Sequence, residues 1–337
     1  MRGEGIIMKN LVQKITRPCG KITDNIIIAS ILSVVVLSIG AGITSIGFDL
    51  LGVQQILSDW LESDNLGIFL SDYLSFAGIW IAVFLFVVIP KGNRPMLKAW
   101  GHNRNGNNIK GIIAGILLGF GTNAICVLIS WLRGDIKLSY YGFEPVILLA
   151  FLGAVFIQSG AEELIDRLYL YQKLRRRYRS PLVAIIINAL VFMSLHIPNP
   201  GFTATAACQI VLIGIIFSVL VYYYDSLWAA MWFHAAWNFT QNLIFGLPNS
   251  GIVSEYSIFK LEAATATNGL FYDVKFGVEG SIGSSIILGV LLIVLIIINR
   301  RKGEKTDIWE AAEETAAEKR EADQRRKEKY QSKHAAS

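Results

Sequence analysis

Apolar residues gather along this chain into long runs separated by short polar gaps, a pattern typical of membrane-spanning helices. A spanning helix needs about 20 apolar residues, within a range of about 17–25. The runs that approach or exceed this length are 25–47, 68–90, 111–132, 145–171, 181–197, 204–223, 226–245 and 281–299. The pattern therefore predicts an all-α fold, a polytopic membrane bundle of about eight transmembrane helices.

The composition agrees with a membrane protein. Of the 337 residues, 53% are hydrophobic and 17% are charged, whereas a soluble domain usually carries about 25% charged residues. We expect three parts, namely a cytoplasmic N-terminal segment (1–24), an integral membrane domain (25–299) whose chemical core is about 145–245, and a charged, helical cytoplasmic tail (300–337). The tail alternates acidic and basic residues without a broad apolar stripe, so we expect it to be solvated.

Basic residues recur in every second gap between the apolar runs. The N-terminal segment and the gaps 91–110 and 172–180 are basic, while the gap 48–67 is acidic. Since cytoplasmic loops carry an excess of Lys and Arg, this pattern predicts a multi-pass protein of the cell membrane with both termini cytoplasmic. The net charge of +5 is then explained by contact with anionic headgroups of the lipid bilayer. We expect no nucleic-acid partner, because a compact basic fold with exposed aromatic residues is missing.

The gap 246–280 is a long segment on the side of the acidic gap. It contains a PNSG sequence and further glycines. Two interpretations remain open: a cap over the outer face, or a loosely ordered connector. We favour the connector.

Polar side chains inside the apolar runs carry the most information about function. In a bilayer an ionisable group costs several kcal/mol unless it faces the bundle interior and finds a partner. The relevant positions are Glu162, Glu163 and Arg167 in the fourth run, His196 in the fifth, and His234 with Asn238 in the seventh. Each one alone could be a helix–helix contact worth about 0.6 kcal/mol, but the whole set indicates a site.

Helical spacing assigns these residues to faces. Glu163 and Arg167 are four residues apart and can pair on one face, whereas Glu162 is rotated by about 100° towards a different neighbour. His234 and Asn238 also share a face, and both could donate hydrogen bonds to one ligand oxygen.

His196 has Phe192 one turn before it, where the phenyl ring could pack against the imidazole. Counted at about 1.5 Å per residue, Glu162 lies about 15 Å and His196 about 24 Å from the cytoplasmic ends of their helices. A tilted, broken or late-starting helix has to bring the two to the same depth.

The set of side chains is suited to hydrolysis, which needs a polarised water and donors aimed at a developing oxyanion. Glu162 supplies a carboxylate, and His196 supplies an imidazole that could bind water or a metal. Glu162, His196 and His234 would also make a zinc ligand set. The residues alone therefore leave two alternatives for cofactors, either none or Zn²⁺.

Three motifs follow one another on successive predicted helices: Glu-Glu-x-x-x-Arg (162–167), Phe-x-x-x-His (192–196) and His-x-x-x-Asn (234–238). Together they resemble the CPBP family of intramembrane proteases, the CAAX protease and bacteriocin-processing family. This family includes the Ras-converting CAAX prenyl endopeptidases and the bacterial Abi proteins. The resemblance covers about 145–245. Asp166 and Leu168 depart from it, since the family often has an aromatic residue before the arginine and a glycine after it.

The resemblance implies an eight-helix bundle and a glutamic or metallo endopeptidase. Its substrate would be a membrane-associated peptide or a lipidated protein, prenylated or not. The implied catalytic residues are Glu162, which activates water, His196, which shares that water or a metal, and the oxyanion-hole residues His234 and Asn238. The implied structural and orienting residues are Glu163, Arg167 and Phe192.

Two other functions remain as alternatives. A non-catalytic membrane protein for bacteriocin immunity or binding would tolerate loss of a motif residue, and this chain retains all of them. A proton-coupled transporter would also place Glu and His in the bilayer. However, it would favour internal repeats, and none is visible.

Overall fold

The computed structural model describes residues 15–17, 19–300, 307–314, 318, 321–322 and 325. The helices are α2 (Ile26–Leu51), α3 (Val53–Leu61), α4 (Asp64–Ser75), α5 (Ala77–Val88), α6 (Leu97–Trp100), α7 (Ile109–Leu132), α8 (Pro145–Glu163), α9 (Tyr171–Arg177), α10 (Pro181–Leu195), α11 (Ala204–Tyr224), α12 (Leu227–Phe239) and α13 (Ile282–Asn299). The π-helical segments are η3 (Leu164–Leu170) and η4 (Thr240–Ile244), and the short 3₁₀ segments are η1 (Ile22–Asp24), η2 (Lys91–Met96), η5 (Ala263–Thr265) and η6 (Val278–Gly280). The strands β1 (Leu138–Tyr140) and β2 (Phe259–Leu261) pair antiparallel.

The expected all-α polytopic membrane bundle is confirmed. Within the described residues, six helical stretches are long and apolar enough to cross a membrane: Ile26–Leu51, Asp64–Val88, Ile109–Leu132, Pro145–Arg177, Ala204–Tyr224 and Ile282–Asn299. The other two predicted spans are the shorter helices α10 and α12, the latter extended by η4. The number of helices that cross the membrane therefore stays a prediction.

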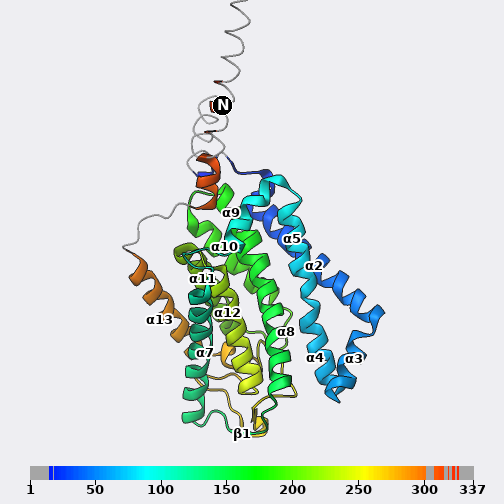
Figure 1. Ribbon diagram of the computed structural model, residues 1–337. Coiled ribbons are helices and arrows are strands. Elements are labelled where there is room, and N and C mark those ends of the chain that lie inside the picture. The colour runs from blue at the N-terminus through cyan, green and yellow to red at the C-terminus, as the bar shows by residue number, and fades with distance from the viewer. Residues whose placement is uncertain are drawn as a thin grey trace, which may run out of the picture.

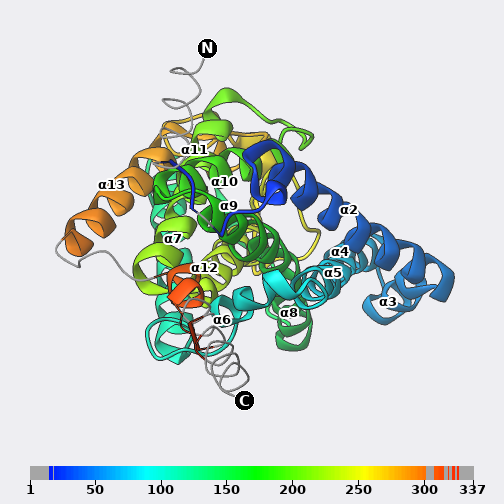
Figure 2. The same ribbon diagram turned by 90° about the horizontal axis from the view of Figure 1, so that it is seen from above.

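The helices form two groups. Figure 2 shows α2 to α5 on one side of a bundle that contains α7, α8 and α10 to α13. α12 packs against both α7 and α8, and most of its residues are buried. The helix that carries His234 and Asn238 is therefore an interior helix, as polar residues in a membrane require.

Glycines bring α7 and α12 close together. A side chain at Gly115 would meet the backbone of Ala229, and one at Gly119 would meet the backbone of Phe233. Small residues four apart on one helix face allow two backbones to approach closely in a membrane. This contact fixes the position of α12, and hence of the polar residues it carries.

One end of the bundle holds the basic segments. α9, the loop from 91 to 110 and the described parts of both termini gather there, at the top of Figure 1, while β1 lies at the other end. We call the first of these the basic end. Positive charge is thus collected on one side of the molecule.

Arginines at the basic end are buried and paired. Arg176 donates from Nε and Nη2 to the Asp24 carboxylate at 2.6 and 2.5 Å, and Lys173 Nζ lies 3.0 Å from Asp24 Oδ1. All three side chains are buried. This part of the basic gap therefore binds a protein carboxylate, although the sequence predicted contact with lipid headgroups.

The expectation of a solvated tail is wrong for its described first turns. Residues 308–314 are helical, and Trp309 is only 3% exposed. Its indole Nε1 donates to the carbonyl oxygen of Gln172 at 2.8 Å, and Asp307 accepts a 2.6 Å hydrogen bond from Arg175. One tryptophan and one carboxylate dock this segment, so no apolar stripe was needed in the sequence.

We expect Asp24→Asn to destabilise the fold by about 3–5 kcal/mol, the usual cost of removing one partner of a buried ion pair. Burial would raise the pKa of Asp24, but the hydrogen bonds and charge of Arg176, together with Lys173, outweigh it and lower the pKa. The stabilisation from a lowered carboxyl pKa is present above the unfolded-state pKa of about 4. It is lost as the pH falls through the folded-state pKa.

Thermal unfolding in detergent as a function of pH measures this effect. The wild type should lose stability below about pH 4 more steeply than the Asp24→Asn variant. The exposed Asp59 supplies the control, since Asp59→Asn should leave the pH profile unchanged. Equal acid sensitivity of the Asp24 variant and the wild type would contradict the assignment.

Candidate active site

Two π-helical segments begin directly beside the predicted site residues. α8 ends at Glu163, and η3 continues it without a break into α9. η4 follows α12 and begins two residues after Asn238. π-helical turns are rare and occur frequently at functional sites, so the backbone itself marks both positions.

The Glu163 carboxylate joins two helices. Its Oε1 accepts a hydrogen bond from Arg167 Nη1 at 3.1 Å and lies 3.0 Å from His234 Nδ1. Arg167 also donates from Nη2 to the Gly214 carbonyl of α11 at 3.2 Å. Glu163 and Arg167 are completely buried, so the sequence-predicted pair forms in the interior and holds His234.

Two phenyl rings surround these charged groups. The Arg167 Cζ lies 4.5 Å from the ring centre of Phe192 and 5.1 Å from that of Phe217. Phe217 stacks on the His234 imidazole at 5.3 Å, and Phe192 packs against the ring of His196 at 4.7 Å. The aromatic pair therefore orients one arginine and both histidines.

Glu162 keeps one oxygen unpaired. Its Oε1 accepts a hydrogen bond from Gln158 Nε2 at 2.6 Å, while the buried Oε2 has no hydrogen-bond partner among the described residues. His234 Nε2 lies 3.7 Å from this oxygen, too far for a hydrogen bond. Because an unsatisfied buried acceptor is costly, Oε2 is poised to bind a donor such as water.

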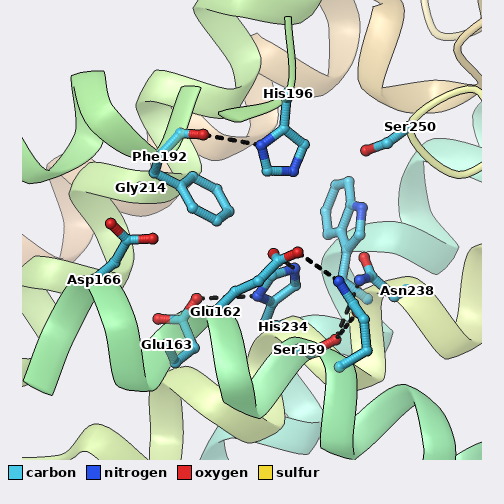
Figure 3. A network of polar contacts seen from close by, with 12 residues as sticks. Ser159, Glu162, Glu163, Asp166, Phe192, His196, Gly214, His234, Asn238 and Ser250 are labelled. Atoms are coloured by element: carbon cyan, nitrogen blue, oxygen red, sulfur yellow. Dashed lines mark hydrogen bonds and ion pairs between the residues drawn. The ribbon is translucent and has the colours of Figure 1, made fainter. Parts of the chain in front are cut away.

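The His196 imidazole has a defined tautomer. It lies at the end of α10, and its Nδ1 is 2.9 Å from the carbonyl oxygen of Phe192. A carbonyl oxygen only accepts, so Nδ1 carries the hydrogen and the neutral ring leaves Nε2 as an acceptor. Figure 3 shows the His196 ring above Glu162 and His234.

A directed chain of hydrogen bonds runs from Asn249 to Glu162. Asn249 Nδ2 donates to Asn238 Oδ1 at 3.1 Å, and Asn238 Nδ2 donates to Ser159 Oγ at 3.2 Å. Ser159 Oγ donates to Gln158 Oε1 at 3.0 Å, and Gln158 Nε2 donates to Glu162. Each side chain donates in the same direction along the chain, so the Asn238 amide has one orientation with Nδ2 as its donor.

Glu279 anchors the start of this chain. Its Oε1 accepts hydrogen bonds from Asn249 Nδ2 at 2.9 Å and from Trp237 Nε1 at 2.8 Å. Its Oε2 accepts from the backbone nitrogen and hydroxyl of Ser250 at 2.6 and 2.8 Å. Burial raises the pKa of Glu279, and the hydrogen bonds from Ser250 and Trp237 offset this only in part.

A tight turn places Asn249. The backbone of Asn249 pairs with that of Ile252 in both directions, and φ is positive at Ser250 (47°) and Gly251 (84°). Positive φ at both central residues defines a type I′ turn, in which glycine is favoured. A side chain at Gly251 would collide with the Pro200 backbone, so the turn lies tightly against the loop after α10.

The preference for a loose connector at 246–280 is therefore wrong. The segment contributes Asn249, Ser250, Ile252 and Glu279 to the lining of a cavity of about 510 Å³. A periodic pattern identifies a helix, but the sequence of an irregular segment has no such pattern to show which part of the fold it contacts.

The cavity brings most of the predicted site residues together. Glu162, Phe192, His196, His234 and Asn238 all line it, and Figure 3 shows them around one space. The depth mismatch expected from the sequence does not separate Glu162 from His196, since both side chains line the same cavity. The other two predicted residues, Glu163 and Arg167, lie behind His234, and Glu163 contacts its imidazole.

Sequence reasoning missed five residues of this arrangement: Gln158, Ser159, Phe217, Asn249 and Glu279. Gln158 stands four residues before Glu162 in an apolar run, a helical spacing that could have revealed it. Phe217 cannot be distinguished from the other apolar residues of its run, and Asn249 and Glu279 lie in a loop segment without a periodic pattern.

Glu162, His196 and His234, the residues that would hold a zinc ion, all line the cavity. The described residues contain no group of three or more His, Cys, Asp or Glu side chains that could hold a metal ion. His234 Nδ1 is engaged by Glu163, and His196 Nδ1 by a backbone carbonyl. In both rings Nε2 is therefore the nitrogen left for water or a metal, and the choice between no cofactor and Zn²⁺ stays a prediction.

The fold and site define a multi-pass helical membrane protein with a buried Glu/His/Asn constellation. Residues 144–240 match a family model described as Type II CAAX prenyl endopeptidase Rce1-like. The match confirms the resemblance carried by the three motifs. It supports a CAAX protease-type intramembrane endopeptidase, that is, a hydrolase. The matched segment is less than a third of the chain and contains the three motifs. Comparison with curated proteins and with solved structures finds no match.

Arg167→Ala should destabilise the protein by about 3–5 kcal/mol, because it leaves Glu163 buried without its cation. Thermal unfolding in detergent and the amount of folded protein in membranes measure this loss. Arg133, half exposed in its pair with Asp135, is the matched control, and Arg133→Ala should cost less than about 1 kcal/mol. Equal stability of the two variants would show that the buried pair contributes no more to the free energy of unfolding than the exposed pair does.

Proposed function

We propose that this protein is an intramembrane endopeptidase that hydrolyses peptide bonds of a membrane-associated or lipidated substrate. Glu162 and His196 activate the water, while His234 and Asn238 stabilise the oxyanion. The observation that carries this proposal is the convergence on one cavity of an unpaired carboxylate oxygen, an imidazole acceptor and an amide of fixed orientation. The family match at residues 144–240 supports the same reaction class.

The proposed attack step uses general base catalysis. A water between Glu162 and His196 gives one proton to Glu162 Oε2, and its oxygen bonds to the carbonyl carbon of the scissile peptide. The carbonyl π electrons move to its oxygen and form a tetrahedral oxyanion. Glu162 then returns the proton to the departing amide nitrogen as the carbon–nitrogen bond breaks, so one carboxyl group acts as base and then as acid.

The oxyanion needs donors already in place. Asn238 Nδ2 has a second hydrogen beyond the one given to Ser159, and Asn249 holds the amide in that orientation. His234 is the second proposed donor, and the Glu163 carboxylate 3.0 Å from its Nδ1 holds the imidazole in place.

A panel of membrane-anchored and prenylated reporter peptides tests the proposal with purified protein. Wild type, Glu162→Gln and Asn238→Ala are compared, each with and without a chelator. We expect the wild type to cleave irrespective of chelator and Glu162→Gln to be inactive. Asn238→Ala should lose about 10²–10³ in kcat, the usual cost of one oxyanion donor.

The matched control is Asn188→Ala. Asn188 is buried and hydrogen-bonded to Asp166 and Ser218 outside the cavity, so its loss should lower stability but leave kcat per folded molecule near the wild-type value. Equal cleavage by wild type and Glu162→Gln would remove Glu162 from the mechanism. Loss of wild-type cleavage on chelation would favour the metal-dependent alternative.

The orientation of Asn238 gives a further prediction. Asn249→Asp replaces the donor to Asn238 Oδ1 by an acceptor, so the Asn238 amide should turn its oxygen towards the oxyanion. We expect kcat to fall about 10²-fold with KM little changed. Adding Glu279→Gln supplies a new donor to the aspartate, so thermal stability should recover while kcat should not.

Ser250→Ala is the matched control here. It removes one hydrogen bond to Glu279 but leaves the bonds between Asn249, Asn238 and Glu279. Its kcat should therefore stay near the wild-type value. If kcat falls equally in the Ser250 and Asn249 variants, the loop acts through general stability and not through the Asn238 amide.

A further inference from the structure

A second cavity lies at the basic end, beside the first turns of the tail. Its volume is about 280 Å³, just below the range of about 300–1,000 Å³ that is usual for small-ligand sites. It is lined by α6 and the loop after it, by α9, by the end of α11 and by residues 307–311 of the tail. This part of the tail, red in Figure 1, packs beside α9. We call this cavity the tail pocket; among the described residues, it shares no lining residue with the cavity that contains Glu162.

The wall that the tail contributes to this pocket is held by charged and aromatic contacts. Asp307 accepts hydrogen bonds from Arg17 Nη2 at 2.7 Å and from Arg175 Nη2 at 2.6 Å. Trp309 is buried, and the centre of its ring lies 4.8 Å from Arg176 Cζ. The tail pocket is therefore part of the folded chain, and the charges of Arg175 and Asp307 satisfy each other.

Two buried polar side chains line the tail pocket without a hydrogen-bond partner. Tyr171 is 3% exposed and Gln172 is 5% exposed, and both line the pocket. Neither side chain forms a hydrogen bond with any residue that the structure describes; Gln172 contributes only its backbone carbonyl, to Trp309. Because a buried polar group without a partner is costly, the hydroxyl and the amide require hydrogen-bonding groups in whatever fills the pocket.

The charges of the lining are balanced. The described residues that line the pocket include two cations, Lys98 and Arg175, and two carboxylates, Asp225 and Asp307. Since Arg175 and Asp307 bind each other, one cation and one carboxylate lie outside that pair. Lys98 is exposed and has no ion-pair partner in the described part of the chain. Electrostatic complementarity therefore favours a ligand with one negative and one positive group.

The residue types indicate which groups these are. Lys98 supplies the point charge that is common in phosphate sites, and Tyr171 and Gln172 add neutral donors for further phosphate oxygens. The Asp225 carboxylate suits an ammonium, and the ring of Tyr222 in the same lining offers an aromatic face to a cation. Aminophospholipid headgroups at the bilayer surface combine these two charged groups.

We propose that the tail pocket binds a phosphoethanolamine group, either as the headgroup of phosphatidylethanolamine or as a soluble phosphate ester. Lys98 and Tyr171 bind the phosphate, and Asp225 binds the ammonium. The proposal does not rest on the endopeptidase function, because binding at this pocket needs no cleavage.

Isothermal titration calorimetry with the purified whole chain in detergent tests the ligand class. The probes are O-phosphoethanolamine and a short-chain phosphatidylethanolamine, each compared with a matched probe that lacks the ammonium, namely glycerol 3-phosphate and a short-chain phosphatidylglycerol. We expect the probe with the ammonium to bind at least about tenfold more tightly in each pair, because only it satisfies both charges. Tighter binding of the lipid than of the soluble ester identifies a headgroup as the source, and the reverse identifies a free ester.

Substitutions in the lining test the location of the site. The Kd for O-phosphoethanolamine should rise at least about tenfold in Lys98→Met and about three- to tenfold in Tyr171→Phe, since each loses a hydrogen bond to a charged group. Lys91→Met and Tyr169→Phe are the matched controls. Lys91 is exposed and Tyr169 is buried, but neither lines the tail pocket, so both variants should bind like the wild type.

Three results would overturn the proposal. They are the absence of binding by both phosphoethanolamine probes, equal binding of the probes with and without the ammonium, and an unchanged Kd in Lys98→Met and Tyr171→Phe. Thermal unfolding checks that each variant is folded. Because the Lys98 side chain is exposed, Lys98→Met keeps the test decisive even if Tyr171→Phe disturbs the packing of α9.

Discussion

The buried contact of Glu163 with Arg167 and His234 is the interaction on which the rest of the site depends. A carboxylate deep in a membrane protein is tolerated only when it is neutralised and hydrogen-bonded. Here one oxygen contacts both the arginine of η3 and the imidazole of α12. Because Glu163 satisfies this cation, the neighbouring Glu162 can keep an oxygen unpaired towards the cavity. One glutamate stabilises the fold, and the adjacent one is left for chemistry.

A second support reaches the site from the loop side. Glu279 and Asn249 hold the Asn238 amide, and the same chain of hydrogen bonds continues through Ser159 and Gln158 to Glu162. The proposed base and the proposed oxyanion donor therefore belong to one polarised network. Hydrogen bonds in such a chain reinforce one another in a low-dielectric interior. The orientation of one proposed catalytic group is consequently coupled to that of the other.

Local periodicity explains how much of this could be predicted from the sequence. The membrane helices follow from apolar runs, and the pair Glu163 and Arg167 follows from a spacing of four residues. Glu279 and Trp309 escape such reasoning, because their partners lie far away in the chain. A loop segment thus completes the site, and the first helical turns of the tail dock, without any repeating pattern. The predicted contact of the basic gap with lipid failed for Arg176 for the same reason, since Asp24 lies 152 positions away.

The two ends of the bundle use charge in opposite ways. At the basic end, Arg175 and Arg176 are bound to Asp307 and Asp24, so their charges close the structure. The lining of the cavity contains acids and imidazoles but, among the described residues, no Lys or Arg. Moving arginines into the cavity would neutralise Glu162 and remove the acceptor that water requires. The separation of charge that indicates the orientation in the membrane is therefore also the condition that keeps the proposed base available.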